Sequence, residues 1–229
     1  MTFEAGPLPT GEAVRVARPV RRSRRRDIST GKLVFDKLFA AFALFTLAPV
    51  MVAIAIATRI GDHGPIFYKH KRIGQNGKPF DCVKFRSMRA DSATVLARLL
   101  ESDPVARAEW DRDQKLKDDP RIHPVGQFLR KTSLDELPQF WNVLKGDMSI
   151  VGPRPIIEDE VERYGVHFAE YCAVRPGITG AWQVGGRNDT SYPHRVALDV
   201  DYVRNATLLE DIRIVLRTIA VVLTQKGAS

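Results

Sequence analysis

The chain has 229 residues, a length typical of one domain with a short attached segment. Hydrophobic residues make up 44% of it and the net charge is +8, which favours anionic partners such as phosphates, nucleic acid or acidic lipid. Two cysteines exclude a disulfide framework and a cysteine-based metal motif, and they fit a reducing cytoplasm.

Residues 1–30 form a basic segment with few apolar side chains, and we expect this tail to be disordered. It carries seven arginines against three acidic residues, so it contributes +4 of the net charge of +8. Five of the arginines lie within residues 21–26, shortly before an apolar stretch. Such a run can bind nucleic acid, but in this place we interpret it as a patch for anionic lipid headgroups.

Residues 38–57 carry no charge, and at 1.5 Å per residue they reach roughly 30 Å, the thickness of a hydrocarbon core. Pro49 near the middle of this segment is expected to kink a helix. Both flanks are basic, so the positive-inside rule puts both ends in the cytoplasm. We therefore predict a re-entrant membrane helix over residues 31–62. A buried core helix and a single-pass helix are the alternatives.

Residues 63–229 are predicted to form a cytoplasmic domain with a mixed α/β, helix-rich fold. Two short extended runs around a turn at residues 74–77 predict a β-hairpin. Helices are expected over residues 88–117, 125–131, 138–144, 156–172 and 206–223, and residues 176–189 are glycine-rich and irregular. The apolar stripe of the last helix indicates packing against the core, with a place in the membrane interface as the alternative.

Two adjacent carboxylates, Asp135 and Glu136, stand where a helix is expected to begin. Ser133 and Glu136 have the spacing of a capping box, and Pro138 suits a first helical turn. A helix N-terminus stabilises anions, so we expect Asp135 to stay ionised and a phosphate to be accommodated beside it. Neighbouring helix residues point about 100° apart, which suits different tasks such as attack and metal binding. From the spacing alone, a structural role as cap and dipole partner is the stronger interpretation.

A carboxylate that attacks phosphorus needs cations to neutralise the phosphate oxygens. Arginine offers a bidentate fork to these oxygens, and lysine offers a point charge. Arg154 lies between two prolines in a stiff loop, which favours a positioned role. Each cation taken alone also fits a solvated surface charge. The candidates are Lys84, Arg86, Arg130, Lys131 and Arg154.

Several motifs are absent from the sequence. It contains neither a phosphate-binding Gly-x4-Gly-Lys-Ser/Thr loop nor a dinucleotide-binding Gly-x-Gly-x-x-Gly. It contains no Gly-x-Ser-x-Gly elbow, and its five histidines have no zinc-ligand spacing. P-loop nucleotide hydrolysis, dinucleotide redox chemistry, the α/β-hydrolase mechanism and zinc hydrolysis therefore lose support.

Five blocks of the sequence resemble the bacterial sugar transferase family, the monotopic polyprenyl-phosphate phosphoglycosyl transferases that start exopolysaccharide, capsule or O-antigen repeat units. The resemblance runs in order from about Lys32 to the C-terminus. The short length is similar to exopolysaccharide-initiating members without a large N-terminal multi-span domain. The blocks are residues 67–80, 83–88, 135–139, 143–155 and 175–184, and they include Asp135-Glu136-Leu137-Pro138-Gln139 and Val151-Gly152-Pro153-Arg154-Pro155.

The resemblance implies a reaction for the acidic pair. Asp135 would attack the sugar-proximal phosphate of a UDP-sugar, UMP would leave, and undecaprenyl phosphate would take the phosphosugar from an aspartyl intermediate. Glu136 would help to hold Mg²⁺. Lys84, Arg130 and Arg154 match basic family positions and inherit phosphate-binding roles.

The resemblance also implies a location and partners. Members carry a re-entrant helix broken at a proline, matched by Pro49, on the cytoplasmic face of the bacterial inner membrane. The implied partners are a UDP-sugar, undecaprenyl phosphate and membrane lipid, but no nucleic acid. UDP-galactose or UDP-glucose is favoured, and the oligomeric state is left open.

The chain departs from the family pattern at two places. Ala48 replaces the serine that often precedes the proline, and Ala181-Trp182 stands where many members have Trp-Ala. The other functions considered are a basic membrane-tethered binding module, a regulator without activity and a metal-dependent phosphohydrolase.

Overall fold

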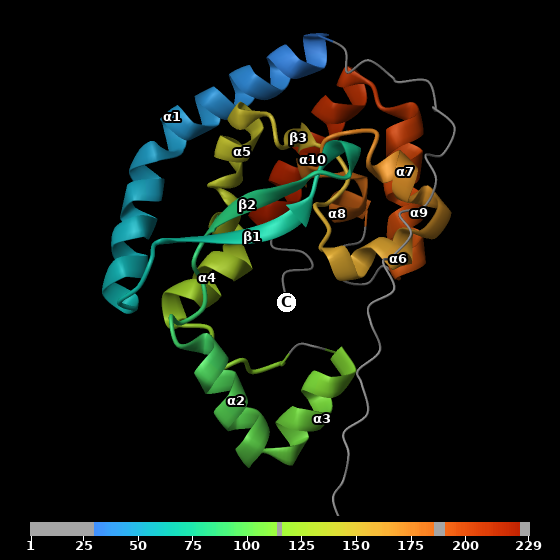
Figure 1. The fold of residues 1–229 in the computed structure, drawn as a ribbon. Helices are drawn as coiled ribbons and strands as arrows, with labels where there is room; N and C mark the ends of the chain where they lie inside the picture. Colours follow the sequence, from blue (N-terminus) through green and yellow to red (C-terminus); the bar gives the residue numbers. More distant parts are fainter. Residues whose placement is uncertain (1–29, 114–115, 186–190, 225–229) are drawn as a thin grey trace, which may run out of the picture.

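The computed structural model of the chain describes residues 30–113, 116–185 and 191–224. The predicted disordered tail, except Thr30, and residues 186–189 of the glycine-rich stretch lie outside the described residues. The prediction that this stretch is irregular is wrong for its described part, where residues 177–179 form a strand and residues 181–185 a helix. The fold is helix-rich and mixed α/β with two small sheets, which confirms the predicted class (Figure 1). Its longer elements are α1 (Thr30–Gly61), β1 (Phe67–Ile73), β2 (Pro79–Phe85), α2 (Ser92–Ser102), α3 (Pro104–Asp113), α4 (Pro124–Thr132), α9 (Tyr192–Asn205) and α10 (Leu208–Thr224).

Shorter elements connect these. They are η1 (Gln75–Gly77), η2 (Leu134–Glu136), α5 (Gln139–Lys145), β3 (Ser149–Val151), η3 (Glu158–Glu160), α6 (Val161–Tyr164), η4 (Gly165–His167), α7 (Phe168–Tyr171), β4 (Gly177–Thr179) and α8 (Ala181–Gly185). The helix predicted over residues 156–172 is thus wrong as one element, because the chain turns at Gly165, whose φ is 49°.

Helix α1 contains Pro49 and bends along one side of the molecule (Figure 1). It is the one helix among the described residues that is long and apolar enough to cross a membrane. Its outer face is bare: Leu38, Phe42 and Phe45 are 67%, 68% and 83% exposed.

Both ends of α1 are fastened to the rest of the domain by polar contacts. Near its start, buried Asp36 accepts hydrogen bonds from Ser149 Oγ (2.8 Å) and the Ile150 N–H (3.2 Å). Just beyond its end, Asp62 pairs with the buried guanidinium of Arg86. Polar contacts therefore bind both ends of the helix to the same domain, one end to β3 and the other to the segment after β2.

The predicted hairpin is confirmed: β1 and β2 pair antiparallel, from Phe67 opposite Phe85 to Ile73 opposite Pro79. Side chains directly opposite each other share a face of such a ladder. Arg72, opposite Phe80, therefore shares a face with Lys84, opposite Tyr68.

Strands β3 and β4 pair in parallel, with Ser149 opposite Gly177. A Cβ added at Gly177 would lie 2.1 Å from the Gly152 nitrogen, so the two chain segments approach as closely as glycine allows. This approach brings the loop that carries Arg154 beside α8.

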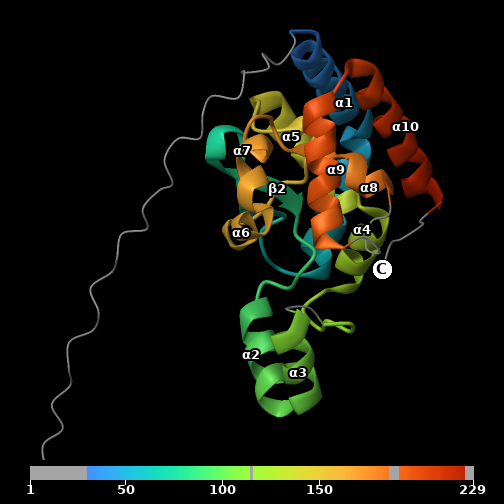
Figure 2. The ribbon, with the colours of Figure 1, turned by 90° about the vertical axis from the view of Figure 1, so that its right-hand side faces the viewer.

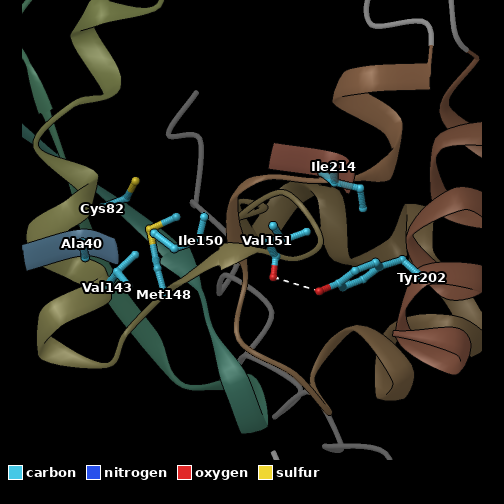
Figure 3. Packing of buried hydrophobic residues seen from close by; sticks show 8 residues of the cluster. All are labelled: Ala40, Cys82, Val143, Met148, Ile150, Val151, Tyr202 and Ile214. Atoms are coloured by element: carbon cyan, nitrogen blue, oxygen red, sulfur yellow. Dashed lines mark hydrogen bonds between the residues drawn. The ribbon is translucent and has the colours of Figure 1, made fainter. Parts of the chain in front are cut away.

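The core joins α1, β2, α5, β3, α9 and α10 (Figure 3). The hydroxyl of Tyr202 lies 3.0 Å from the Val151 carbonyl oxygen (Figure 3). It also lies 2.7 Å from Asp211 Oδ1. The buried residues of this core are Ala40, Cys82, Val143, Met148, Ile150, Val151, Tyr202 and Ile214.

The prediction of one helix over residues 88–117 is wrong. The chain breaks at Asp103-Pro104 into α2 and α3, which project together from the body (Figures 1 and 2). Helix α2 has no buried residue, so its leucines do not join the main core.

Helix α10 confirms the last predicted helix and has two apolar sides. Ile214 is buried in the core, whereas Leu209, Leu216 and Ile219 are 58%, 61% and 51% exposed. The packing interpretation is thus confirmed for the inner side only.

Asn142 of α5 ties the hairpin to the segment that carries the acidic pair. Its buried side chain accepts a hydrogen bond from the Val83 N–H (3.0 Å) and donates to the Asp81 carbonyl (2.7 Å). Since Lys84 follows directly, this amide fixes where that lysine enters the site.

Replacing Asn142 with leucine would leave both backbone groups of β2 without these partners. We expect Asn142→Leu to lower the free energy of unfolding by about 2–4 kcal/mol, measured by denaturant unfolding in detergent. Asn205→Leu is the control, because Asn205 is exposed and should change stability by under about 0.5 kcal/mol. Equal stability of the two variants would contradict this assignment.

Candidate active site

The acidic pair lies on η2, a single turn between α4 and α5. Ser133 ends α4 with φ 57° and makes no side-chain hydrogen bond that caps η2, so the predicted capping box is wrong. A single turn has only a small helix dipole. This dipole therefore stabilises the charges of Asp135 and Glu136 less than the neighbouring cationic side chains do.

Lys84 of β2 is the immediate partner of both carboxylates. Its Nζ lies 2.5 Å from Glu136 Oε1 and 3.8 Å from Asp135 Oδ2. The two carboxylates differ in exposure: the side chain of Asp135 is 12% exposed and that of Glu136 is 36% exposed.

The same lysine leaves the two carboxylates with different pKa values. Burial raises the pKa of Asp135 to about 6, and the charges of Lys84 and Arg130 oppose that rise. Burial also acts to raise the pKa of Glu136, but the charge and hydrogen bond of Lys84 outweigh it and hold that pKa below its usual value. At neutral pH both groups are mostly ionised, and Asp135 is the one closest to titrating.

The pair opens into a cleft of about 820 Å³ that brings most of the predicted cations together. Lys84, Arg130, Lys131 and Arg154 all line this cleft with Asp135 and Glu136. These residues come from β2, α4, η2 and the loop after β3, so only the fold assembles them.

Arg86 does not join this group. Its guanidinium pairs with Asp62, and it donates to the carbonyl oxygens of Pro65 (2.6 Å) and Met88 (3.3 Å). It therefore anchors the end of α1 and does not line the cleft.

Arg154 and Arg130 keep donors for a ligand. Arg130 Nε donates to Ser87 Oγ at 2.8 Å. Within the described part of the chain, no hydrogen bond or ion pair holds the Arg154 guanidinium, which lies over the ring of Trp182 with Cζ 5.7 Å from the centroid.

Arg72 is a cleft cation that the sequence analysis missed as a site residue. It donates to the Pro155 carbonyl oxygen at 3.1 Å and lies 3.6 Å from Glu160. Its charge contributes to the low pKa of Glu136. Side chains alternate between the two faces of the hairpin, and this alternation puts Arg72 on the same face as Lys84. The sequence pattern could therefore have indicated Arg72 as a site residue.

No cluster of three or more metal-ligating side chains occurs among the described residues. The acidic pair is therefore not an all-protein metal cage. Its donors do fit Mg²⁺, which commonly takes one or two carboxylates, waters and substrate phosphates. Glu136, ionised and partly exposed, would be the carboxylate that holds it.

The sequence from residue 28 to residue 225 matches the family described as "Bacterial sugar transferase". This chain belongs to the bacterial sugar transferase family. The predicted resemblance, and the prediction of a transferase, are confirmed at the level of the family.

Three relatives show what the chain is similar to. The chain is 54% identical over 198 residues to "Undecaprenyl-phosphate galactose phosphotransferase" of Salmonella typhimurium, covering 86% of this chain and 41% of that protein. It is 49% identical to "Exopolysaccharide production protein ExoY" of Sinorhizobium fredii, covering 86% and 87%. It is 41% identical to "UDP-glucose:undecaprenyl-phosphate glucose-1-phosphate transferase" of Xanthomonas campestris, covering 86% and 40%. The chain thus spans about two fifths of some relatives and most of another.

The pKa of Asp135 can be measured directly from carboxyl ¹³C chemical shifts during a pH titration, with Asp135→Asn to assign the signal. We expect a midpoint about two units above an ordinary aspartate. Because the Lys84 charge lowers this pKa, Lys84→Met should move the midpoint to still higher pH. A midpoint near 4, or one that Lys84→Met leaves unchanged, would contradict this description of the pair.

Proposed function

We propose that the protein transfers a hexose-1-phosphate from a UDP-sugar to undecaprenyl phosphate, as the first membrane step of exopolysaccharide synthesis. The observation that carries the proposal is one cleft containing a buried aspartate, an ionised glutamate and several cations. The printed names of relatives specify galactose in one case and glucose in another, so both sugars belong in the assay.

In the first step, a carboxylate oxygen of Asp135 attacks the phosphorus that bears the sugar. The bond from this phosphorus to the bridging oxygen breaks, and UMP leaves with the electron pair. In the second step, a phosphate oxygen of undecaprenyl phosphate attacks the same phosphorus and displaces Asp135. Two displacements through a covalent carboxylate intermediate split one difficult transfer into two easier ones.

The cations have separate tasks in this reaction. Lys84 keeps the acidic pair ionised, as its 2.5 Å contact with Glu136 indicates. Arg154 and Arg130 offer N–H donors to the phosphate oxygens, where charge must be neutralised during transfer. We place Mg²⁺ at Glu136, where it would neutralise diphosphate charge when bound.

The contacts of α1 support the re-entrant helix over a single crossing. Its start is fastened to β3 through Asp36, and its end to the segment after β2 through Arg86 and Asp62. A straight span would put these two ends on opposite sides of a hydrocarbon core roughly 30 Å thick. The bare apolar face of the helix, with the interior contacts on its other face, suits a bent helix that dips into one leaflet.

On this proposal, the catalytic domain lies on the cytoplasmic face of the bacterial inner membrane. An acceptor phosphate at the membrane surface then meets a UDP-sugar from the cytoplasm in the same cleft. The exposed apolar side of α10 suits the interface beside α1.

Asp135→Asn tests the nucleophile. We expect it to reduce UMP release from UDP-galactose or UDP-glucose by on the order of 10⁴-fold, because an amide cannot form the phosphosugar intermediate. UMP is measured with undecaprenyl phosphate present, and sugar-phosphate labelling of the protein is measured without it.

Asp91→Asn is the matched control, since Asp91 is an exposed carboxylate outside the cleft and pairs with Arg89. It should retain most activity. Full activity of Asp135→Asn would reject the nucleophile. UDP-sugar hydrolysis that needs no lipid acceptor would favour a phosphohydrolase instead.

Topology is tested by cysteine labelling at Thr10 and His63 in a chain without native cysteines. His63 is exposed and next to Asp62, so it reports the end of α1 without breaking the Arg86 pair. We expect a membrane-impermeant reagent to label both sites only from the cytoplasmic side. Labelling from opposite sides would reject the re-entrant helix.

A further inference from the structure

The ring of Trp182 in α8 lies close to two arginines from different parts of the chain. The guanidinium carbon of Arg154 is 5.7 Å from the ring centroid, and that of Arg195 is 4.4 Å from it. The ring lines the cleft and is 8% exposed. Guanidinium groups at such distances are attracted to the electron-rich face of an indole.

The contact with the Trp182 ring leaves the N–H donors of Arg154 available to a ligand. Prolines on both sides stiffen the backbone of Arg154, but they do not orient its long side chain. Within the described residues no hydrogen bond or ion pair orients it either, so the ring of Trp182 is the contact that does. A ring can hold a guanidinium in place while all of its N–H groups stay available for phosphate oxygens.

Arg195 of α9 is a buried charged residue with few hydrogen bonds. It is 8% exposed, and among the described residues its Nε and Nη2 have no hydrogen-bond partner. Its Nη2 is 3.9 Å from Glu160 Oε1, too far for a hydrogen bond. Burying a charge with few hydrogen bonds is costly, so the nearby carboxylates of Glu160 and Asp199 and the contacts with aromatic rings together offset the cost.

The arginines and rings continue in series away from the cleft. Arg195 lies 5.0 Å from the ring of Tyr192, and Arg163 lies 4.9 Å from the same ring. Arg163, Tyr192, Arg195, Trp182 and Arg154 therefore form an alternating ladder that ends at the cleft. We call these five residues the arginine–aromatic ladder.

We propose that Trp182 and Arg195 are positioning residues for Arg154. Trp182 holds the Arg154 guanidinium toward the diphosphate of the sugar nucleotide, and Arg195 holds the ring of Trp182. The proposal rests on the proposed function, because that function assigns Arg154 to the diphosphate.

The proposal also explains the order Ala181-Trp182 in this chain. Ala181 is partly buried and packs against the main core cluster, so the small side chain belongs to the core side of α8. The next position faces the cleft and Arg154. The ring must therefore stand at residue 182 to reach this arginine.

A double-mutant cycle between Trp182 and Arg154 tests the proposal, with UMP release from a UDP-sugar and undecaprenyl phosphate as the assay. We expect Trp182→Ala to lower kcat/KM about tenfold, mainly by raising KM for the UDP-sugar. In an Arg154→Ala background the same change should cost less than about twofold, because no guanidinium is left to position. Trp182→Phe keeps an aromatic face and should stay within about threefold of wild type.

Arg195→Gln provides a second cycle that does not depend on the folding of Trp182→Ala, and it should couple to Arg154 in the same direction. Trp110→Ala is the control, because Trp110 carries the guanidinium of Arg121 at 4.7 Å and does not contact Arg154. Its cost should be the same in both backgrounds.

Equal costs of Trp182→Ala with and without Arg154 would overturn the proposal, since a merely structural tryptophan behaves that way. Failure of the proposed function has a different signature. In that case wild-type protein releases no UMP, or Arg154→Ala retains full activity whatever stands at residue 182.

Discussion

The contact of the Lys84 ammonium with two adjacent carboxylates is the constraint on which the site depends. It joins the hairpin to the turn between α4 and α5, at 2.5 Å from Glu136 and 3.8 Å from Asp135. A buried and a partly exposed carboxylate side by side would otherwise repel each other, which favours protonation of one of them. With the lysine present, Glu136 is held ionised and Asp135 keeps a pKa of about 6. Two neighbouring carboxylates thereby become chemically different.

This difference matches the division of labour in the proposed reaction. A firmly ionised, partly exposed glutamate suits a divalent cation, and a buried, poorly solvated aspartate suits attack on phosphorus. The scaffold keeps the lysine in register through Asn142, which binds the backbone on both sides of Cys82. It also holds the long apolar helix α1 on the same domain, through polar contacts at both ends of α1.

The hairpin, the long apolar helix and the acidic pair could be predicted because each depends on residues that are close together in the sequence. Lys84, Arg130 and Arg154 were predicted as site residues because a phosphate needs nearby cations and because they match basic family positions, and the structure brings them to one cleft. Arg86 looked equivalent to Lys84 in the sequence. Arg86 lies just beyond the end of β2, and its guanidinium pairs with Asp62, a carboxylate 24 residues upstream.

Other misses have similarly non-local causes. The break at Asp103-Pro104 was readable from the proline, but the helical pattern on both sides suggested one helix. Ser133 was taken for a cap because its spacing fits, whereas its left-handed backbone makes it the end of α4. The partners of Trp182 lie 28 residues before it and 13 residues after it, so no local pattern shows that they meet.

The most direct test of the covalent reaction is to incubate the wild-type protein with a UDP-sugar and no lipid acceptor, then locate any adduct by mass spectrometry. The account predicts a hexose-phosphate on the peptide that contains Asp135, with one UMP released per adduct, and loss of the adduct when undecaprenyl phosphate is added. Transfer to the lipid at full rate with no adduct at Asp135 at any time would contradict it.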